Sequence, residues 1–167
     1  LRRRNPEWRI GLIPAAVGGS PLDLWQPGAP LLEAALERAV VAAPAGRFAG
    51  VIWHQGENDS RFPEKAATYS ERLNRTIEAF RVRLDLPELP FIAGELGPFL
   101  ADNVDPGFPG LAMVMRAIRT LPEWVSFTAI AGAEGLNHIG DHVHLDTPSQ
   151  VIFGQRYAAA YLGLAGR

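Results

Sequence analysis

An apolar run that breaks abruptly into polar residues constrains the fold of this chain most. Residues 48–53 (FAGVIW) are typical of a strand buried on both faces of a sheet. The polar residues that follow surround Gly56 and are His54, Gln55, Glu57, Asn58 and Asp59. Loops at the carboxyl ends of parallel strands carry the chemistry of α/β folds. The stretch therefore predicts a catalytic or binding rim at one edge of a sheet.

The order of elements along the whole chain predicts an α/β fold. Four apolar runs are typical of strands, at residues 8–13, 48–53, 91–93 and 124–130. Helical spacing predicts four helices, over about residues 31–43 and 64–84, one ending near residue 121, and one from residue 147. Strands that alternate with helices imply a parallel sheet covered on both faces. For the last helix we expect Thr147 at the N-cap, Pro148 at N1 and Gln150 at N3.

Composition narrows the classes of protein and of partner. A length of 167 residues suits one domain with a substantial core, and 47% hydrophobic residues are typical of globular proteins. The formal net charge of −2 gives no reason to expect nucleic acid as a partner. The chain has no cysteine, which excludes a disulfide, a thiol nucleophile and a thiolate metal site. With no signal peptide and no long apolar stretch, we expect no membrane partner, and the compartment stays open.

A second polar cluster lies between the last predicted strand and the last predicted helix. It contains Asp141, His142 and His144. An aspartate three residues before a histidine on a tight loop can accept the Nδ1 proton and leave Nε2 free as a general base. The alternative is that Asp141 caps a turn while both histidines face solvent.

Paired glycines follow the first predicted strand and allow the backbone to approach a ligand closely. The backbone N–H of Gly18 or Gly19, together with the Gln55 amide, is suited to stabilise an oxyanion. Gln55 is equally suited to satisfy a loop carbonyl. Glu57 is expected to orient His144 or His54, or to pair with an arginine. His54 alone is more typical of a hydrogen-bonded structural histidine.

Three motifs in this order resemble the SGNH (GDSL-type) hydrolase superfamily. They are the Gly-Gly turn, HQGEND after the next strand, and DHVHLD before the last helix. Within the superfamily, the chain is most similar to the sialate O-acetylesterase-like group, which includes the acetyl xylan esterases of carbohydrate esterase family 6. The resemblance runs from Ile10 to about Leu162. It implies a three-layer α/β/α flavodoxin-like fold and a serine esterase that acts on acetylated carbohydrates without a metal or cofactor.

The resemblance also implies a role for each site residue. His144 is the expected general base, and Asp141 orients it. Gly19, through its backbone N–H, and Gln55, through its side chain, are the expected oxyanion donors, while Glu57 supports the histidine loop. The remaining expected substrate contacts are Gly18, Ser20, His54 and Asn58.

One motif of the superfamily has no counterpart in this sequence. The nucleophile block, usually G-Q-S-N, follows the first and central strand of the family fold. We therefore expect a single domain over residues 1–167 that is amino-terminally incomplete and lacks that strand. Ser20, in Gly18–Leu22 (GGSPL), approaches the G-x-S-x-G elbow but lacks its final glycine. An esterase that uses Ser20 as nucleophile is the less favoured alternative.

Two other interpretations remain open. The first is a non-catalytic relative that binds a sugar or a partner without turnover. The second is a metal site, for which imidazole and carboxylate ligands would suit zinc or manganese. Its candidate ligands are His54, Glu57, Asp59, Asp141, His142 and His144. Because no two histidines have i, i+4 spacing on a predicted helix, we expect no metal.

Overall fold

A three-stranded parallel sheet forms the centre of the computed structural model, which describes residues 1–103 and 107–165. The strand order is β1 (Val51–Trp53), β2 (Phe91–Gly94) and β3 (Thr128–Ala131). Ile52 of β1 pairs with Ile92 of β2, which in turn pairs with Ala129 of β3. The predicted α/β class is confirmed.

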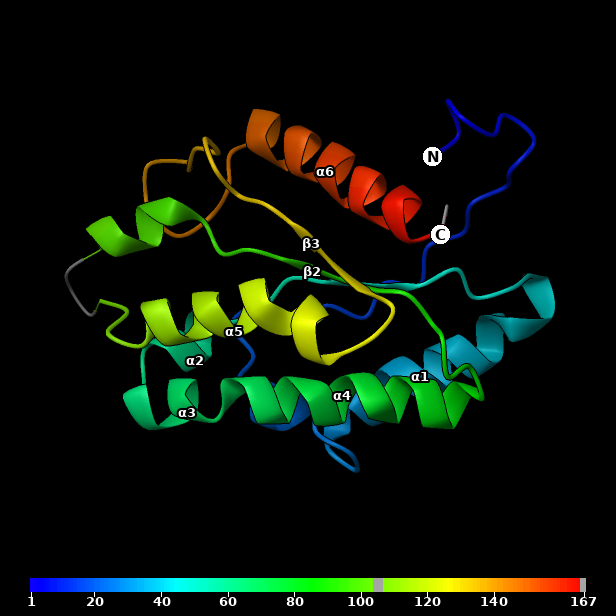
Figure 1. The fold of residues 1–167 in the computed structure, drawn as a ribbon, viewed down its shortest axis with the longest axis horizontal. Coiled ribbons are helices and arrows are strands. Elements are labelled where there is room, and N and C mark those ends of the chain that lie inside the picture. The colour runs from blue at the N-terminus through cyan, green and yellow to red at the C-terminus, as the bar shows by residue number, and fades with distance from the viewer. Residues whose placement is uncertain (104–106, 166–167) are drawn as a thin grey trace.

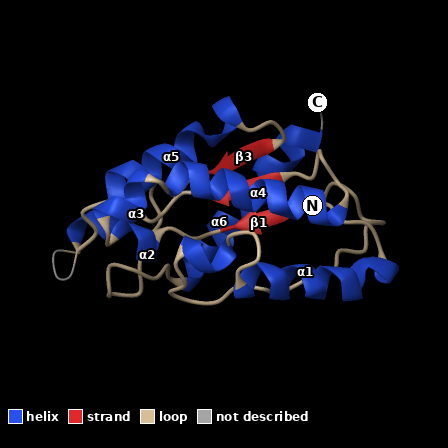
Figure 2. Cartoon of the chain, turned by 90° about the horizontal axis from the view of Figure 1, so that it is seen from below, coloured by secondary structure: helices blue, strands red, loops and turns tan. Residues whose placement is uncertain are grey.

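Helices cover both faces of this sheet, as Figures 1 and 2 show. The helix α6 (Thr147–Ala165) lies on one face, against β2 and β3. The other face carries α1 (Pro30–Ala42), α4 (Tyr69–Leu84) and α5 (Leu111–Trp124). The shorter elements are α2 (Glu57–Ser60), α3 (Pro63–Ala67), and the 3-10 turns η1 (Leu22–Trp25), η2 (Ala43–Ala45) and η3 (Pro98–Asp102). This arrangement is the predicted three-layer, flavodoxin-like fold.

Two hydrophobic clusters, one on each face, hold these layers together. Adjacent residues of a strand point to opposite faces, so Phe91 and Ile92 of β2 enter different clusters. Phe91 packs with residues such as Ile77 of α4 and Ile118 of α5. Ile92 packs with Phe153 of α6. Within the described residues, no helix is long and apolar enough to cross a membrane.

The strand predicted at residues 8–13 is wrong. This segment pairs with no strand in the part of the chain that the structure describes, and its apolar side chains are exposed, with Leu12 at 82%. A strand needs a neighbour for its backbone hydrogen bonds, and apolar residues alone do not supply one. The outer edge of β1 is likewise without a paired strand among the described residues. Ile52, in the middle of β1, is 66% exposed.

The helix predicted over residues 64–84 and the strand predicted over residues 124–130 both differ from the structure. The helix is divided into α3 and α4 at Thr68, whose φ of −104° and ψ of 5° leave the helical region. The strand begins only at Thr128, because Trp124 is the last residue of α5. Pro122 is tolerated inside the final turn of that helix. Apolar content at residues 124–127 therefore marked a helix end and its following loop.

The amino-terminal cap of α6 lies one residue earlier than predicted. The Asp146 carboxylate accepts the backbone N–H of Ser149 at 2.8 Å, and its carbonyl accepts that of Gln150 at 2.9 Å. Thr147 is thus the first helical residue. A carboxylate at this position also interacts favourably with the positive end of the helix dipole.

Gly94 lies where α6 crosses the end of β2 most closely. A Cβ at this position would collide with the Tyr157 hydroxyl oxygen and lie 2.6 Å from Cζ of Phe153. We expect Gly94→Ala to lower the free energy of unfolding by about 1–3 kcal/mol, because the extra methyl overpacks the interface. Gly154→Ala is the matched control, since Gly154 is a helical position with open space around it. Urea denaturation should show that control to be stabilised by about 0.5–1 kcal/mol; equal effects would contradict the close approach at Gly94.

Candidate active site

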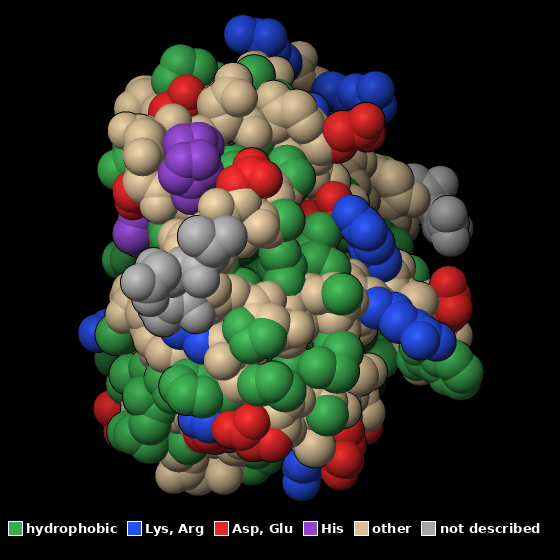
Figure 3. All heavy atoms as spheres, turned by 90° about the vertical axis from the view of Figure 1, so that its left-hand side faces the viewer, with side chains coloured by type: hydrophobic (Ala, Val, Ile, Leu, Met, Phe, Trp, Pro, Cys, Tyr) green, Lys and Arg blue, Asp and Glu red, His purple; other side chains and the backbone are tan. Residues whose placement is uncertain are grey.

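The predicted site residues gather at the carboxyl edge of the sheet. This edge lies on the left of Figure 1, where β1 leads into α2 and the loop after β3 leads into α6. Figure 3 faces this side and shows histidine side chains beside acidic ones. The third component is the turn containing Gly18 and Gly19, which hydrogen bonds connect to the residues after β1.

Asp141 and His144 form a closely bonded pair on the loop before α6. Oδ2 of Asp141 lies 2.6 Å from Nδ1 of His144, and Oδ1 accepts the backbone N–H groups of Val143 and His144, both at 2.9 Å. These bonds, above all that from the His144 N–H, hold the pKa of Asp141 well below its usual value. The ionised carboxylate therefore stabilises the fold above the usual aspartate pKa, and this contribution is lost as the pH falls through the lowered value. The His144 side chain is 73% exposed, which leaves Nε2 accessible for proton transfer.

Glu57 pairs with His54 rather than bonding His144 directly. Oε1 of Glu57 lies 3.3 Å from Nε2 of His54, whose ring packs edge-on against Phe153. Burial raises the pKa of Glu57, but the hydrogen bond and charge of His54, with the charge of His144, outweigh it and hold the pKa below its usual value. The β1 loop therefore lies against α6, the helix that follows the histidine loop.

Gln55 is buried and makes hydrogen bonds through both ends of its side-chain amide. Nε2 donates to the Ser20 carbonyl at 3.1 Å and to Oδ2 of Asp59 at 2.7 Å. The Tyr69 hydroxyl donates to the Gln55 backbone carbonyl at 2.7 Å and also lies 3.1 Å from Oε1. Both amide hydrogens are therefore engaged within the protein. In this geometry, Gln55 satisfies a loop carbonyl, which is the alternative that the sequence left open.

The Gly-Gly turn is tied to the β1 loop by a second side-chain amide. Nδ2 of Asn58 donates to the Gly19 carbonyl at 2.9 Å. Gly19 has a φ of +68°, in the left-handed region that glycine adopts most readily, and both Gly18 and Gly19 are exposed. The turn is thus held in place while its backbone stays open to a ligand.

Ser20 has a structural environment in this turn. Its hydroxyl donates to the Val17 carbonyl at 2.8 Å and accepts the Nε1–H of Trp25 at 3.0 Å. The residue is only 8% exposed. A nucleophilic serine needs a nearby base and access to substrate, whereas both bonds of this hydroxyl fix the turn to η1.

Asp59 anchors the β1 loop, a role that sequence reasoning missed. Its carboxylate is fully buried and accepts hydrogen bonds from the Leu22 N–H, from Nε2 of Gln55 and from Nη2 of Arg72, at 2.8, 2.7 and 2.6 Å. Its oxygens therefore already serve three donors. In the described ranges, no three histidine or acidic side chains are arranged to hold a metal ion, so the six proposed ligands do not form one site.

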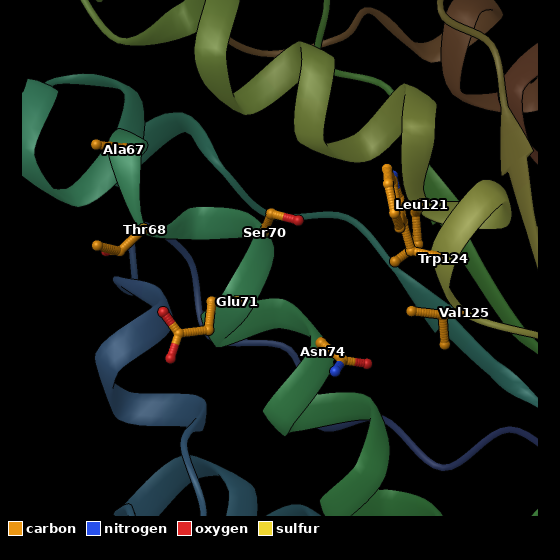
Figure 4. Close-up of a pocket in the computed structure, with 8 residues that line it drawn as sticks. All are labelled: Ala67, Thr68, Ser70, Glu71, Asn74, Leu121, Trp124 and Val125. Atoms are coloured by element: carbon orange, nitrogen blue, oxygen red, sulfur yellow. The ribbon is translucent and has the colours of Figure 1, made fainter.

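A separate hollow of about 340 Å³ lies between α4 and α5 (Figure 4). Glu71 and Asn74 line it from α4, and Leu121 and Trp124 line it from α5. None of the predicted site residues contributes to it. The candidate active site is therefore the exposed edge with the Asp141–His144 pair and not this hollow.

Comparison with known proteins identifies the family. The sequence profile described as carbohydrate esterase, sialic acid-specific acetylesterase, matches residues 1–163. The chain belongs to this family of carbohydrate esterases. The predicted resemblance to the sialate O-acetylesterase-like group is thereby confirmed.

Individual relatives agree with this assignment. A probable carbohydrate esterase of Arabidopsis thaliana is 32% identical over 156 residues, which are 92% of this chain and 55% of that protein. The X-ray structure of an Arabidopsis thaliana protein superposes with a TM-score of 0.77 at 30% identity, covering 87% of this chain and 58% of that one. The crystal structure of NanS is similar in fold, with a TM-score of 0.64 at 18% identity, over 86% of this chain and 56% of that one. The chain spans a little over half the length of these relatives.

Proposed function

We propose that this carbohydrate esterase chain carries the general base of a carbohydrate O-acetylesterase. The Asp141–His144 pair supports the proposal, because the carboxylate fixes the imidazole with Nδ1 engaged and Nε2 accessible. In the proposed reaction, a serine oxygen attacks the acetyl carbonyl carbon while Nε2 of His144 takes the serine proton. The same proton passes to the departing sugar oxygen, which leaves an acetyl-serine. Water then attacks that ester with His144 again as base, and acetate is released.

The nucleophile in this proposal comes from a further strand paired with the outer edge of β1. That edge lacks a strand partner among the described residues, and Ile52 on it is 66% exposed. A parallel strand there would end beside His54 and the Gly-Gly turn. The matched region covers only 55–58% of these relatives, which is compatible with such a segment. The domain over residues 1–167 is then the larger part of a complete catalytic domain.

The oxyanion donors are assigned to Gly19 and Gln55 in this scheme. Gly19 would donate through its backbone N–H, since the turn is exposed. Gln55 would exchange its 3.1 Å bond to the Ser20 carbonyl, the longer of its two, for one to the oxyanion. The exposed Gly18 and His54, with Ser20 and Asn58 on either side of the turn, are the proposed substrate contacts. Glu57 supports the histidine loop through charge.

Acetate release tests the proposal. Acetylated xylan oligosaccharides and O-acetylated sialic acid are supplied to this chain and to the product of the coding sequence extended upstream of Leu1. We expect the extended product to release acetate and the 167-residue chain to hydrolyse p-nitrophenyl acetate negligibly, because a base without its nucleophile forms no acyl-enzyme. Rapid turnover by the short chain that Ser20→Ala abolishes would instead assign the nucleophile to Ser20.

A non-catalytic sugar-binding relative is the second candidate. It is favoured by the environment of Ser20, whose hydroxyl is committed to Val17 and Trp25. This candidate predicts that the extended product binds the acetylated sugars, as isothermal titration calorimetry would detect, without releasing acetate. The same substrate panel therefore separates the two functions.

A further inference from the structure

We propose that His138 is a positioning residue that holds the Asp141–His144 pair in its geometry. Nδ1 of His138 accepts the backbone N–H groups of Gly140 and His142, both at 3.0 Å. The inference rests on the proposed function only in taking the Asp141–His144 pair as catalytic. The hydrogen bonds of His138 belong to the loop structure and do not depend on that function.

The loop from residue 138 to residue 145 is closed at its base by backbone pairing. His138 and Leu145 form an antiparallel bridge, and the Ile139 N–H donates to the His144 carbonyl at 3.0 Å. Above this base, two side-chain acceptors bind the backbone. Nδ1 of His138 takes the N–H groups of residues 140 and 142, and Oδ1 of Asp141 takes those of residues 143 and 144. His138 thus binds the backbone in the first half of the loop, and Asp141 binds it in the second half.

The backbone between these acceptors is in conformations that need support. Gly140 has a φ of +110° and His142 a φ of +55°, and the latter is uncommon for a residue other than glycine. The His138 ring packs on His142 at 4.1 Å between centroids and on Phe99 of η3 at 5.1 Å. The two bonds to Nδ1 fix the backbone of residues 140–142 in this conformation. Without them, Asp141 would lose its alignment with His144.

The bonds also define the chemical state of His138. A ring nitrogen that accepts two N–H groups must carry a lone pair, so Nδ1 is unprotonated and the proton of the neutral ring sits on Nε2. His144 is held in the opposite form, with its proton on Nδ1 facing the Asp141 carboxylate. The two histidines of this loop are therefore predicted to differ in tautomer.

Nuclear magnetic resonance of the histidine ring nitrogens in this 167-residue chain tests the inference. At a pH where both rings are neutral, we expect His138 to be protonated on Nε2 and His144 on Nδ1. In His138→Leu, which keeps bulk but removes the acceptor, His144 should shift toward the Nε2-protonated form. In His138→Asn, whose Oδ1 can replace Nδ1 as acceptor, the Nδ1-protonated form of His144 should be retained. A general loss of stability would not be rescued selectively in this way.

Two results would overturn the inference. One is the finding that His138 in the wild-type chain is protonated on Nδ1. This measurement needs no variant, so it remains decisive even if His138→Leu fails to fold. The other is an unchanged His144 tautomer in folded His138→Leu. Because neither measurement uses an ester, a failure to release acetate would count against the proposed function and not against the role of His138. In an esterase-active form, kcat should fall by up to about 10²-fold in His138→Leu with KM retained, and His138→Asn should restore it.

Discussion

Replacing Asp59 by alanine should lower the free energy of unfolding by about 3–5 kcal/mol. The carboxylate is fully buried and accepts Nη2 of Arg72 at 2.6 Å, together with the Leu22 N–H and the Gln55 amide. The Arg72 side chain is only 9% exposed, and removing Asp59 takes away its buried carboxylate partner. Removing the buried partner of an ion pair costs far more than removing a surface partner, even though Asp23 still contacts Nη1 of Arg72. Urea denaturation followed by circular dichroism measures the change.

Asp23→Ala is the matched control, because Asp23 also contacts Arg72. Oδ1 of Asp23 lies 3.0 Å from Nη1 of Arg72, but its side chain is 50% exposed. Solvent screens such a pair, so we expect a change of no more than about 1 kcal/mol. Similar losses in the two variants would mean that burial does not determine the strength of the Asp59 contact. Asp59→Asn keeps one acceptor oxygen and should fall between them.

His144→Ala should lower kcat for acetate release by about 10²–10⁴-fold in the esterase-active form. In the proposed mechanism the imidazole takes the serine proton through Nε2, while its Nδ1 is bonded to Asp141. Because His144 acts in proton transfer, KM should change little. Initial rates on an acetylated sugar across a range of concentrations separate the two constants.

Rescue with imidazole is the control for this substitution. Free imidazole can enter the exposed space that the 73% exposed side chain leaves and should restore part of the rate. Restoration by imidazole would show that the loss is chemical and not structural. A His144→Ala enzyme with unchanged kcat would remove His144 from the mechanism.

Local sequence patterns predicted much of the fold and one part of the site. The strands at residues 51–53 and 91–94 and the helix α1 were predictable, since apolar periodicity reports which face of an element is buried. The contact of Asp141 with His144 spans three residues on a tight loop, so spacing alone indicated it. The family resemblance followed from motifs that are likewise local.

Contacts between distant residues were not predictable in this way. Gln55 has the same side chain whether it donates to an oxyanion or to a loop carbonyl, and only the approach of Ser20, thirty-five positions away, decides which. From the sequence, Asp59 was a plausible metal ligand. In the structure, its carboxylate instead accepts hydrogen bonds from Arg72 of α4 and from the Leu22 backbone N–H. His138 gave no sequence signal beyond being one more histidine in the loop.

The sequence alone indicated the α/β class through its periodicity, the family through its motifs, and the Asp141–His144 contact through its short spacing. Only the tertiary structure decided which polar groups are already satisfied. It assigned Gln55, Ser20 and Asp59 to internal hydrogen bonds. Among the described residues, it left the segment at residues 8–13 and the outer edge of β1 without strand partners. Hydrogen-bonding groups have a limited number of partners, and which partners they find depends on chain segments that only folding brings together.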